Sequence, residues 1–175
     1  IHELLDGLTL YTVKDQDPLE QSGRVYKITR DDQDNRLTHL KVTGGFWRLK
    51  EEINGEKINQ IRIYSGKKYE LTDEVGPGEI CAIPGLKNTY VGQGIGACKS
   101  NTLPVIEPVM TYQIVPDEET DLVLFYQNLK QFEEEDPTLK IQWEEELQEI
   151  HLYLMGEVQQ EILAHNIKER LGIGI

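Results

Sequence analysis

Residues 22–68 contain eleven basic and six acidic side chains, a positive excess that the rest of the chain does not share. Lysine and arginine bind phosphate oxygens, and aromatic rings such as those of Tyr26, Phe46 and Trp47 stack on nucleobases. On the outer face of a small barrel, these residues would form a phosphate-contacting wall. The alternative is an ordinary solvated face, because outward strand positions are usually charged. The basic candidates are Arg24, Lys27, Arg30, Arg36, Lys41, Arg48, Lys50, Lys57 and Arg62.

Two short fragments imitate ligand-binding motifs. Residues 92–97 fit a loose G-x-G-x-x-A pattern, but Pro104 follows within a few residues and no helix pattern intervenes. A glycine-rich barrel turn is therefore favoured over a dinucleotide or phosphate site. Residues 31–35 are acidic enough for calcium, yet the glycine and terminal glutamate of an EF-hand loop are missing, so a hairpin turn is favoured. The chain contains no GxxxxGK[ST] loop.

Acidic runs at residues 133–136 and 144–146 raise the possibility of acid–base catalysis by paired carboxylates. We expect them instead to be solvated faces, at a helix end and in a hairpin turn. The four histidines and the two cysteines have no ligand spacing, so we predict no metal site. No serine, histidine and aspartate set stands in a recognisable nucleophile setting, although such sets can also assemble in space. A stand-alone enzyme remains an alternative, and it would require a deep pocket with converging carboxylates of perturbed pKa.

Short apolar strand patterns follow one another in the first half of the chain. They cover residues 24–30, 36–43, 46–49, 58–64 and 79–83, and turn sequences such as Gly44-Gly45, Asn54-Gly55 and Gly76-Pro77-Gly78 separate them. This arrangement, with no convincing helix among the strands, predicts a small antiparallel β-barrel over residues 22–103. We interpret residues 1–21 as a connector and the proline-containing residues 101–108 as a domain boundary.

The pattern changes to alternating strands and helices after residue 104. We expect strands at residues 109–115, 139–143 and 150–154 and helices at 118–134 and 157–171. This order predicts a ferredoxin-like split βαβ sandwich over residues 104–175, with both helices on one face of the sheet and the last strand truncated. The fold class is thus multi-domain, a small β-barrel followed by an α+β domain.

Residues 150–171 show the change of period within one segment. Ile150, Leu152 and Leu154 alternate as in a strand, and Gly156 marks the switch to a helix. We expect Gly156 to allow a sharp turn against the sheet and Gly172 to end the helix. One apolar stripe is predicted along the helix, comprising Val158, Ile162, Leu163, Ile167 and Leu171. In the preceding helix we expect Asp117 as the N-cap.

Charge is unevenly distributed along the chain. The net charge is −13, and residues 105–175 alone carry 16 acidic and 4 basic side chains. The first part can therefore contact phosphate, whereas the second should avoid it. No apolar run is long enough to span a membrane, and the two separated cysteines fit a reducing compartment. We expect a cytoplasmic protein without membrane contact.

Several motifs in this order resemble a known family. Residues 104–109 (PVIEPV), 134–138 (EEDPT) and 154–158 (LMGEV) resemble the third domain of elongation factor G and its relatives. The barrel motifs are similar to the second domain of translational GTPases: RLT at 36–38, GG at 44–45, VGPGEI at 75–80 and GLKNT at 85–89. The resemblance covers residues 20–175. Within this superfamily, RLTHLK at 36–41 is most like the ribosomal-protection tetracycline-resistance proteins.

The resemblance implies a function for the chain. The intact protein would be a GTPase that binds the bacterial ribosome and releases tetracycline, with GTP and magnesium held by a domain before Ile1. The alternative is an ordinary elongation or release factor. This chain would hold no catalytic residue and no cofactor, and it would act as a monomer. Its barrel would face small-subunit ribosomal RNA and the GTPase domain, and its acidic domain would face ribosomal protein. The RNA-binding residues would be Arg24, Arg36, Lys41, Arg48 and Arg62.

Overall fold

A computed structural model describes residues 2–12, 20–101, 107–117 and 120–175 of the 175-residue chain. It divides into two compact units, residues Ile1–Asn101 and Thr102–Ile175. The predicted domain boundary at residue 104, the start of the expected helix at residue 118 and part of the expected connector lie outside the described residues. The described helices are all too short or too polar to cross a lipid bilayer.

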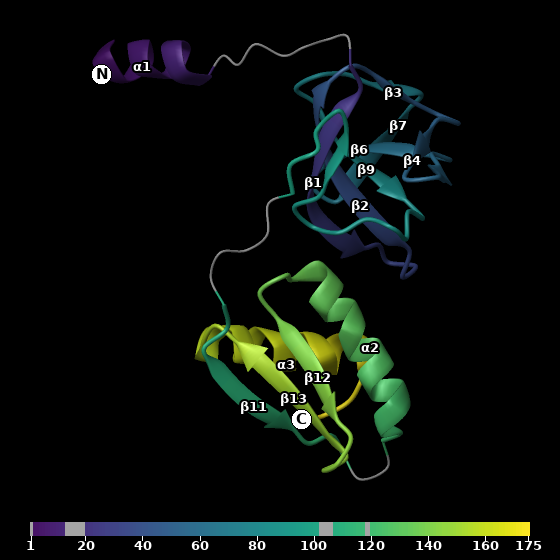
Figure 1. Ribbon diagram of the computed structural model, residues 1–175, viewed down its shortest axis with the longest axis vertical. Coiled ribbons are helices and arrows are strands. Elements are labelled where there is room, and N and C mark those ends of the chain that lie inside the picture. The colour runs from purple at the N-terminus through teal and green to yellow at the C-terminus, as the bar shows by residue number, and fades with distance from the viewer. Residues whose placement is uncertain (1, 13–19, 102–106, 118–119) are drawn as a thin grey trace. The chain divides into compact units, whose positions relative to one another are not determined.

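A six-stranded antiparallel sheet forms most of the first unit (Figure 1). Its strand order is β10-β1-β2-β9-β6-β7, and two short two-stranded sheets, β3-β8 and β4-β5, accompany it. The large sheet contains β1 (Ser22–Arg30), β2 (Arg36–Gly44), β6 (Ile61–Ser65), β7 (Lys68–Thr72), β9 (Ile80–Pro84) and β10 (Gly94–Gly96). The short sheets contain β3 (Trp47–Arg48), β4 (Glu52–Ile53), β5 (Glu56–Lys57) and β8 (Glu74–Val75).

Side chains from the large and the short sheets share one hydrophobic core. Leu40 and Ile83 reach it from the large sheet, and Trp47, Ile53 and Val75 reach it from the short sheets. All five are at most 3% exposed. The sheets therefore enclose a common interior, which confirms the predicted small antiparallel barrel.

Sequence patterns missed several elements of the first unit. Strands β4, β5, β8 and β10 were not predicted, because they span only two or three residues. Strand β7 was also not predicted, although Tyr69 and Leu71 alternate there with polar residues. The interval 1–21, expected to be a connector, contains the helix α1 (His2–Thr12). Its leucines Leu4, Leu5, Leu8 and Leu10 are 49% to 71% exposed.

The glycine-rich segment of residues 92–97 is required by close backbone packing. A Cβ atom at Gly94 would lie 2.0 Å from the carbonyl oxygen of Cys98, and one at Gly96 would lie 2.1 Å from that of Gln21. Gly96 also has a φ of +67°, a conformation that side chains disfavour. Strand β10 can thus pair with β1 only because these positions lack side chains. The structure supports the barrel interpretation of this motif.

The second unit is a three-stranded antiparallel sheet with two helices (Figure 1). Strands β11 (Met110–Ile114), β12 (Lys140–Glu144) and β13 (Glu149–Leu154) lie in the order β11-β13-β12. Helices α2 (Leu122–Glu135) and α3 (Glu157–Leu171) cover one face of this sheet, as predicted. Phe125, Leu129, Leu163 and Ile167 pack there against Ile141, Ile150, Leu152 and Leu154. The arrangement confirms the α+β fold class.

The start of α2 and the role of Gly156 before α3 differ from the prediction, whereas α3 begins at Glu157 as expected. Helix α2 is capped by Asp121 and not by Asp117, because the carboxylate of Asp121 accepts hydrogen bonds from the N–H groups of Val123 and Leu124. Gly156 does precede α3, but its φ of 168° is extended backbone that any residue adopts. A Cβ there would have no neighbour within 4 Å. The expectation that Gly156 is a sterically required hinge is wrong.

The predicted apolar stripe of α3 is divided between two faces. Leu163 and Ile167 are buried, whereas Val158 and Ile162 are 71% and 56% exposed. Successive side chains on a helix are rotated by about 100°, so residues four apart lie in one row along its surface. Val158 and Ile162 form one row, and Leu163 and Ile167 form the row beside it. Only the row with Leu163 and Ile167 faces the sheet. The predicted end of the helix is confirmed, because Gly172 has a left-handed conformation with a φ of +70°.

Candidate nucleic-acid interface

Three of the five predicted RNA-binding residues lie on one face of the large sheet. Arg24 of β1 is directly opposite Lys41 of β2. Arg62 of β6 is opposite Ala82 of β9, and Ala82 is opposite His39 of β2. Opposite residues in an antiparallel sheet point to the same side, as do residues two apart in a strand. Arg24, Lys41 and Arg62 therefore belong to the outer face, on which His39 also lies.

Arg36 and Arg48 do not belong to this face. Arg36 is in the same row of β2 as the buried Thr38, and its guanidinium donates to Thr89 Oγ1 at 2.9 Å and to the Thr89 carbonyl at 2.6 Å. Arg48 lies in the short β3-β8 sheet, where it forms an ion pair with its cross-strand partner Glu74. The prediction that all five residues form one wall is wrong in this respect. Their role in RNA binding stays a prediction.

Arg24 and Lys41 also make structural contacts. The guanidinium of Arg24 donates to Ser100 Oγ at 2.7 Å, and the Lys41 ammonium donates to the carbonyl of Gly78. Each contact joins a strand of the large sheet to a loop far away in sequence. Arg24 and Lys41 therefore also stabilise the barrel.

Arg62 is the most buried of the five cations, with 9% exposure. Its Nη1 donates to Asp31 Oδ2 at 2.9 Å, its Nε donates to Gln60 Oε1 at 2.7 Å, and its guanidinium lies 4.5 Å from the ring centroid of Tyr69. Burial alone would raise the pKa of Asp31, but hydrogen bonds from Arg62, Asn35 and Gln33 outweigh it and lower this pKa to about 2. Asp31 is thus a permanently charged partner at neutral pH.

Four rings form a continuous row on the outer face. Their centroids are 5.9 Å apart for Tyr26 and His39, 6.1 Å for His39 and Tyr64, and 5.3 Å for Tyr64 and Tyr69. The rings come from β1, β2, β6 and β7. Tyr26 and Tyr69 are 43% and 45% exposed. The outer face therefore offers aromatic surface together with its cations.

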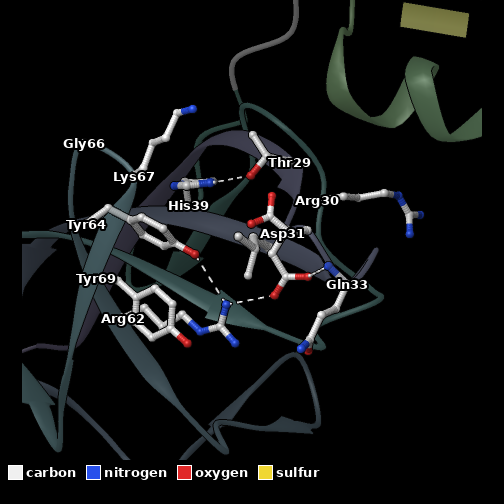
Figure 2. A pocket seen from close by; sticks show the side chains of 12 residues that line it. Thr29, Arg30, Asp31, Gln33, His39, Arg62, Tyr64, Gly66, Lys67 and Tyr69 are labelled. Atoms are coloured by element: carbon white, nitrogen blue, oxygen red, sulfur yellow. Dashed lines mark hydrogen bonds and ion pairs between the residues drawn. The ribbon is translucent and has the colours of Figure 1, made fainter. Parts of the chain in front are cut away.

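A pocket of about 630 Å³ opens beside this row (Figure 2). Figure 2 shows Tyr64 and Tyr69 on one side, His39 and Thr29 above, and the Asp31–Arg62 pair below. His39 Nε2 and Thr29 Oγ1 are 2.8 Å apart. Burial and the charge of Lys27 lower the pKa of His39, so its ring is neutral at pH 7. The pocket combines a neutral polar ring, aromatic surface and charged groups.

Sequence reasoning missed His39, Tyr64, Tyr69 and Lys67, which line this pocket. The signal was present in part, because residues 61–64 alternate and strand periodicity places Arg62 and Tyr64 on one side. The pairing of Tyr64 with Tyr69 depends on the turn at residues 65–68, whose strand β7 was not predicted. The row of rings could therefore not be assembled from single strands.

The acidic run at the end of α2 takes part in ion pairs and hydrogen bonds. In the run at residues 133–136, Glu133 pairs with Lys130 and Glu135 with Arg170. Asp136 accepts a hydrogen bond from Gln159 at 2.7 Å. Within the described ranges, no three histidine, cysteine or acidic side chains are grouped to hold a metal ion. The run at residues 144–146 is exposed, as expected of a solvated face, whereas Glu133, Glu135 and Asp136 are partly buried and paired.

Comparison with known proteins gives matches in both units. Residues 105–175 match the family described as Elongation Factor G, domain III. Elongation factor G of Thermotoga neapolitana is 29% identical over 98% of this chain, and elongation factor 2 of Methanopyrus kandleri is 34% identical over 65% of it. The chain spans 26% and 10% of the length of these two relatives. It therefore corresponds to a limited section of each.

A solved structure shows the same fold. The crystal structure of a protein from Thermus thermophilus superposes with a TM-score of 0.76 at 18% identity, and the match covers 90% of this chain and 25% of that one. The agreement extends across most of both units. The match of residues 105–175 to domain III of elongation factor G and the similarity to elongation factors G and 2 support the interpretation of the chain as a middle section of a translational GTPase.

Proposed function

We propose that this chain is the central, ribosome-binding section of a GTP-dependent translation factor. The match of residues 105–175 to domain III of elongation factor G carries the proposal, and the similarity to a complete elongation factor G over 98% of the chain extends it to the barrel. In the intact protein, a separate domain upstream would bind GTP and magnesium. This section would contribute binding surface and no catalytic group.

The charge distribution supports separate partners for the two units. The outer face of the barrel carries Arg24, Lys41 and the exposed Lys27 and Lys67, and we assign it to small-subunit ribosomal RNA. Residues 105–175 carry 16 acidic and 4 basic side chains, and we assign this unit to basic ribosomal protein. The GTPase domain of the same protein would be the second neighbour of the barrel.

Cosedimentation of the complete 175-residue chain with purified bacterial ribosomes tests this proposal. Reversing the charge of Lys27 and Lys67 together to glutamate should weaken association at least about tenfold and reduce its salt dependence, because both ammonium groups are exposed. The control is Lys57→Glu in strand β5, also exposed but outside the large sheet. Absence of wild-type association, even at low salt, would contradict the proposal.

We further propose that the intact protein protects bacterial ribosomes from tetracycline. The support is the sequence RLTHLK at residues 36–41, which forms most of strand β2 and resembles the resistance proteins. Expression of the complete gene in a sensitive bacterium should raise the tetracycline concentration that stops growth. Unchanged sensitivity, with GTP-dependent support of translation, would favour an ordinary elongation factor. That alternative has support in the names of the relatives, which are elongation factors G and 2.

A further inference from the structure

We propose that the pocket on the outer face of the barrel binds an unstacked nucleobase of single-stranded RNA, with the ring of Tyr69 as its stacking surface. The inference rests on the proposed ribosome-binding function and assigns one subsite to it. The observations that carry it are the row of four rings, the adjacent pocket and the cations at its border (Figure 2).

Tyr69 has the position that a stacking platform requires. Its side chain comes from β7, which forms the edge of the large sheet, and it is 45% exposed. The guanidinium of Arg62 lies against one face of the ring, 4.5 Å from its centroid, and fixes the orientation of the ring. Arg62 is itself held by Asp31 at 2.9 Å. The ring is therefore pre-organised, so that binding costs little side-chain entropy.

The lining of the pocket fits a base better than a bare phosphate. Arg30, Arg62 and Lys67 are accompanied by the carboxylates of Asp31 and Asp32, so the charge inside is nearly balanced. A phosphate ion alone would gain little from such a site. A neutral, flat ligand gains from the rings and can form hydrogen bonds with the neutral His39 or with Thr29.

Lys67 supplies a place for the RNA backbone. It lies in the β6–β7 turn, two residues before Tyr69, and its side chain is exposed. Figure 2 shows Lys67 at the border of the pocket, on the opposite side from Arg30. A base that enters the pocket would thus leave its phosphates near an ammonium group at the rim. This combination of ring and rim cation is typical of single-strand binding surfaces.

Fluorescence anisotropy with the complete 175-residue chain tests the subsite. The probes are a labelled oligoadenylate RNA, an abasic oligomer of the same length and a blunt RNA duplex. The wild-type chain should bind oligoadenylate about tenfold more tightly than the other two, because only oligoadenylate offers accessible bases. Equal binding of the oligoadenylate and the abasic oligomer would overturn the proposal.

Substitutions at Tyr69 separate stacking from general attraction. Tyr69→Ala should weaken oligoadenylate binding about tenfold, whereas Tyr69→Phe should retain it, because the ring remains. Tyr90→Ala is the matched control, since Tyr90 is 42% exposed and does not line the pocket. An equal loss for Tyr69→Ala and Tyr90→Ala would overturn the proposal. Tyr69-dependent binding of an acidic peptide, without RNA binding, would also overturn it in favour of a protein partner.

Ribosome cosedimentation with the same variants distinguishes this inference from the proposed function. If Tyr69→Ala binds ribosomes as tightly as the wild type does, and also binds oligoadenylate as tightly as the wild type does, the proposed subsite is wrong and the ribosome-binding function stands. If the chain binds oligoadenylate through Tyr69 but does not associate with ribosomes, the subsite stands and the proposed function fails.

Discussion

The two units of the chain use charged side chains in different ways. In the barrel, Arg24, Arg36 and Lys41 reach hydroxyl or carbonyl oxygens of distant loops, and Arg62 reaches the carboxylate of Asp31. In the second unit the helices and sheet meet mainly through apolar side chains. Many of its carboxylates, such as those of residues 144–146, remain exposed. Cations join the strands of the barrel to distant loops, whereas in the α+β unit such contacts, for example from Lys130 to the Ile141 carbonyl at 2.8 Å, only supplement the apolar packing.

This difference has a physical origin in the elements of each unit. The barrel is built of short strands joined by loops whose backbone groups need polar partners, and cationic side chains on the strands provide several of them. The helices of the second unit satisfy their backbone groups internally. The barrel should therefore be sensitive to single polar or backbone changes, and the second unit more tolerant.

The sharpest comparison uses one glycine from each unit. Gly94→Ser should lower the free energy of unfolding of the barrel by about 4 kcal/mol, since its Cβ would lie 2.0 Å from a backbone oxygen. Gly156→Ser should leave the second unit unchanged or raise its stability by a few tenths of a kcal/mol, because the site is open and serine is a good N-cap.

Urea unfolding followed by tryptophan fluorescence measures both variants, because Trp47 reports on the barrel and Trp143 on the second unit. Hydrogen exchange assigns the loss to one unit. Similar destabilisation by both substitutions would remove the distinction between a backbone-limited barrel and a tolerant helix start.

The Asp31–Arg62 pair provides the next largest effect. Asp31→Ala should destabilise the barrel by about 3 kcal/mol, because it leaves the nearly buried guanidinium of Arg62 without its counter-charge. Asp34→Asn is the control in the same turn, where an acid with 68% exposure pairs with Arg30 and where asparagine tolerates the φ of 62°. It should cost under about 1 kcal/mol. Thermal unfolding of both variants tests this order, and equal losses would contradict it.

Sequence patterns were most informative in the second unit. The strand at residues 150–154 and the helix at 157–171 followed directly from a period of two changing to a period of nearly four. The pattern could not decide which row of α3 faces the sheet, because Val158 and Ile162 are as apolar as the buried Leu163 and Ile167. That choice depends on the angle at which the helix meets the sheet.

The candidate interface was predictable only in part. Charge and aromatic content drew attention to residues 22–68, but the contacts that each cation makes depend on distant segments of the chain, and Trp47 is buried in the core. Arg36 and Thr89 are 53 residues apart, and Arg62 and Asp31 are 31 apart. Such pairs cannot be inferred from spacing along the chain. Tyr69 belongs to the row of rings only because the register of β6 and β7 places it opposite Tyr64.

In the second unit, Arg170 is an exception to the mainly apolar packing. Its substitution should lower stability less than Asp31→Ala lowers that of the barrel. Its guanidinium donates twice to Glu135, at 3.0 Å in each case, and lies 4.4 Å from the ring centroid of Phe132. Arg170→Ala should therefore lower the stability of this unit by about 2 kcal/mol. Lys168→Ala, on the same turn of α3, should change it by less than about 0.5 kcal/mol. A loss as large as that of Asp31→Ala would contradict the contrast between the units.

The smallest expected effect is a dependence on pH confined to the barrel. The pKa of Asp31 is lowered from 3.8 to about 2 in the folded chain, so the unfolded chain binds the proton more readily between these values. The stabilisation is complete above about pH 5 and is lost as pH falls towards 2, by about 1 kcal/mol after allowance for solvent screening. The difference in unfolding free energy between wild type and Asp31→Ala should shrink accordingly in urea titrations at decreasing pH. If this difference in unfolding free energy stays constant from about pH 5 to about pH 2.5, Arg62 does not stabilise the charged form of Asp31. The ion pair would then not be an example of a charge that stabilises the barrel.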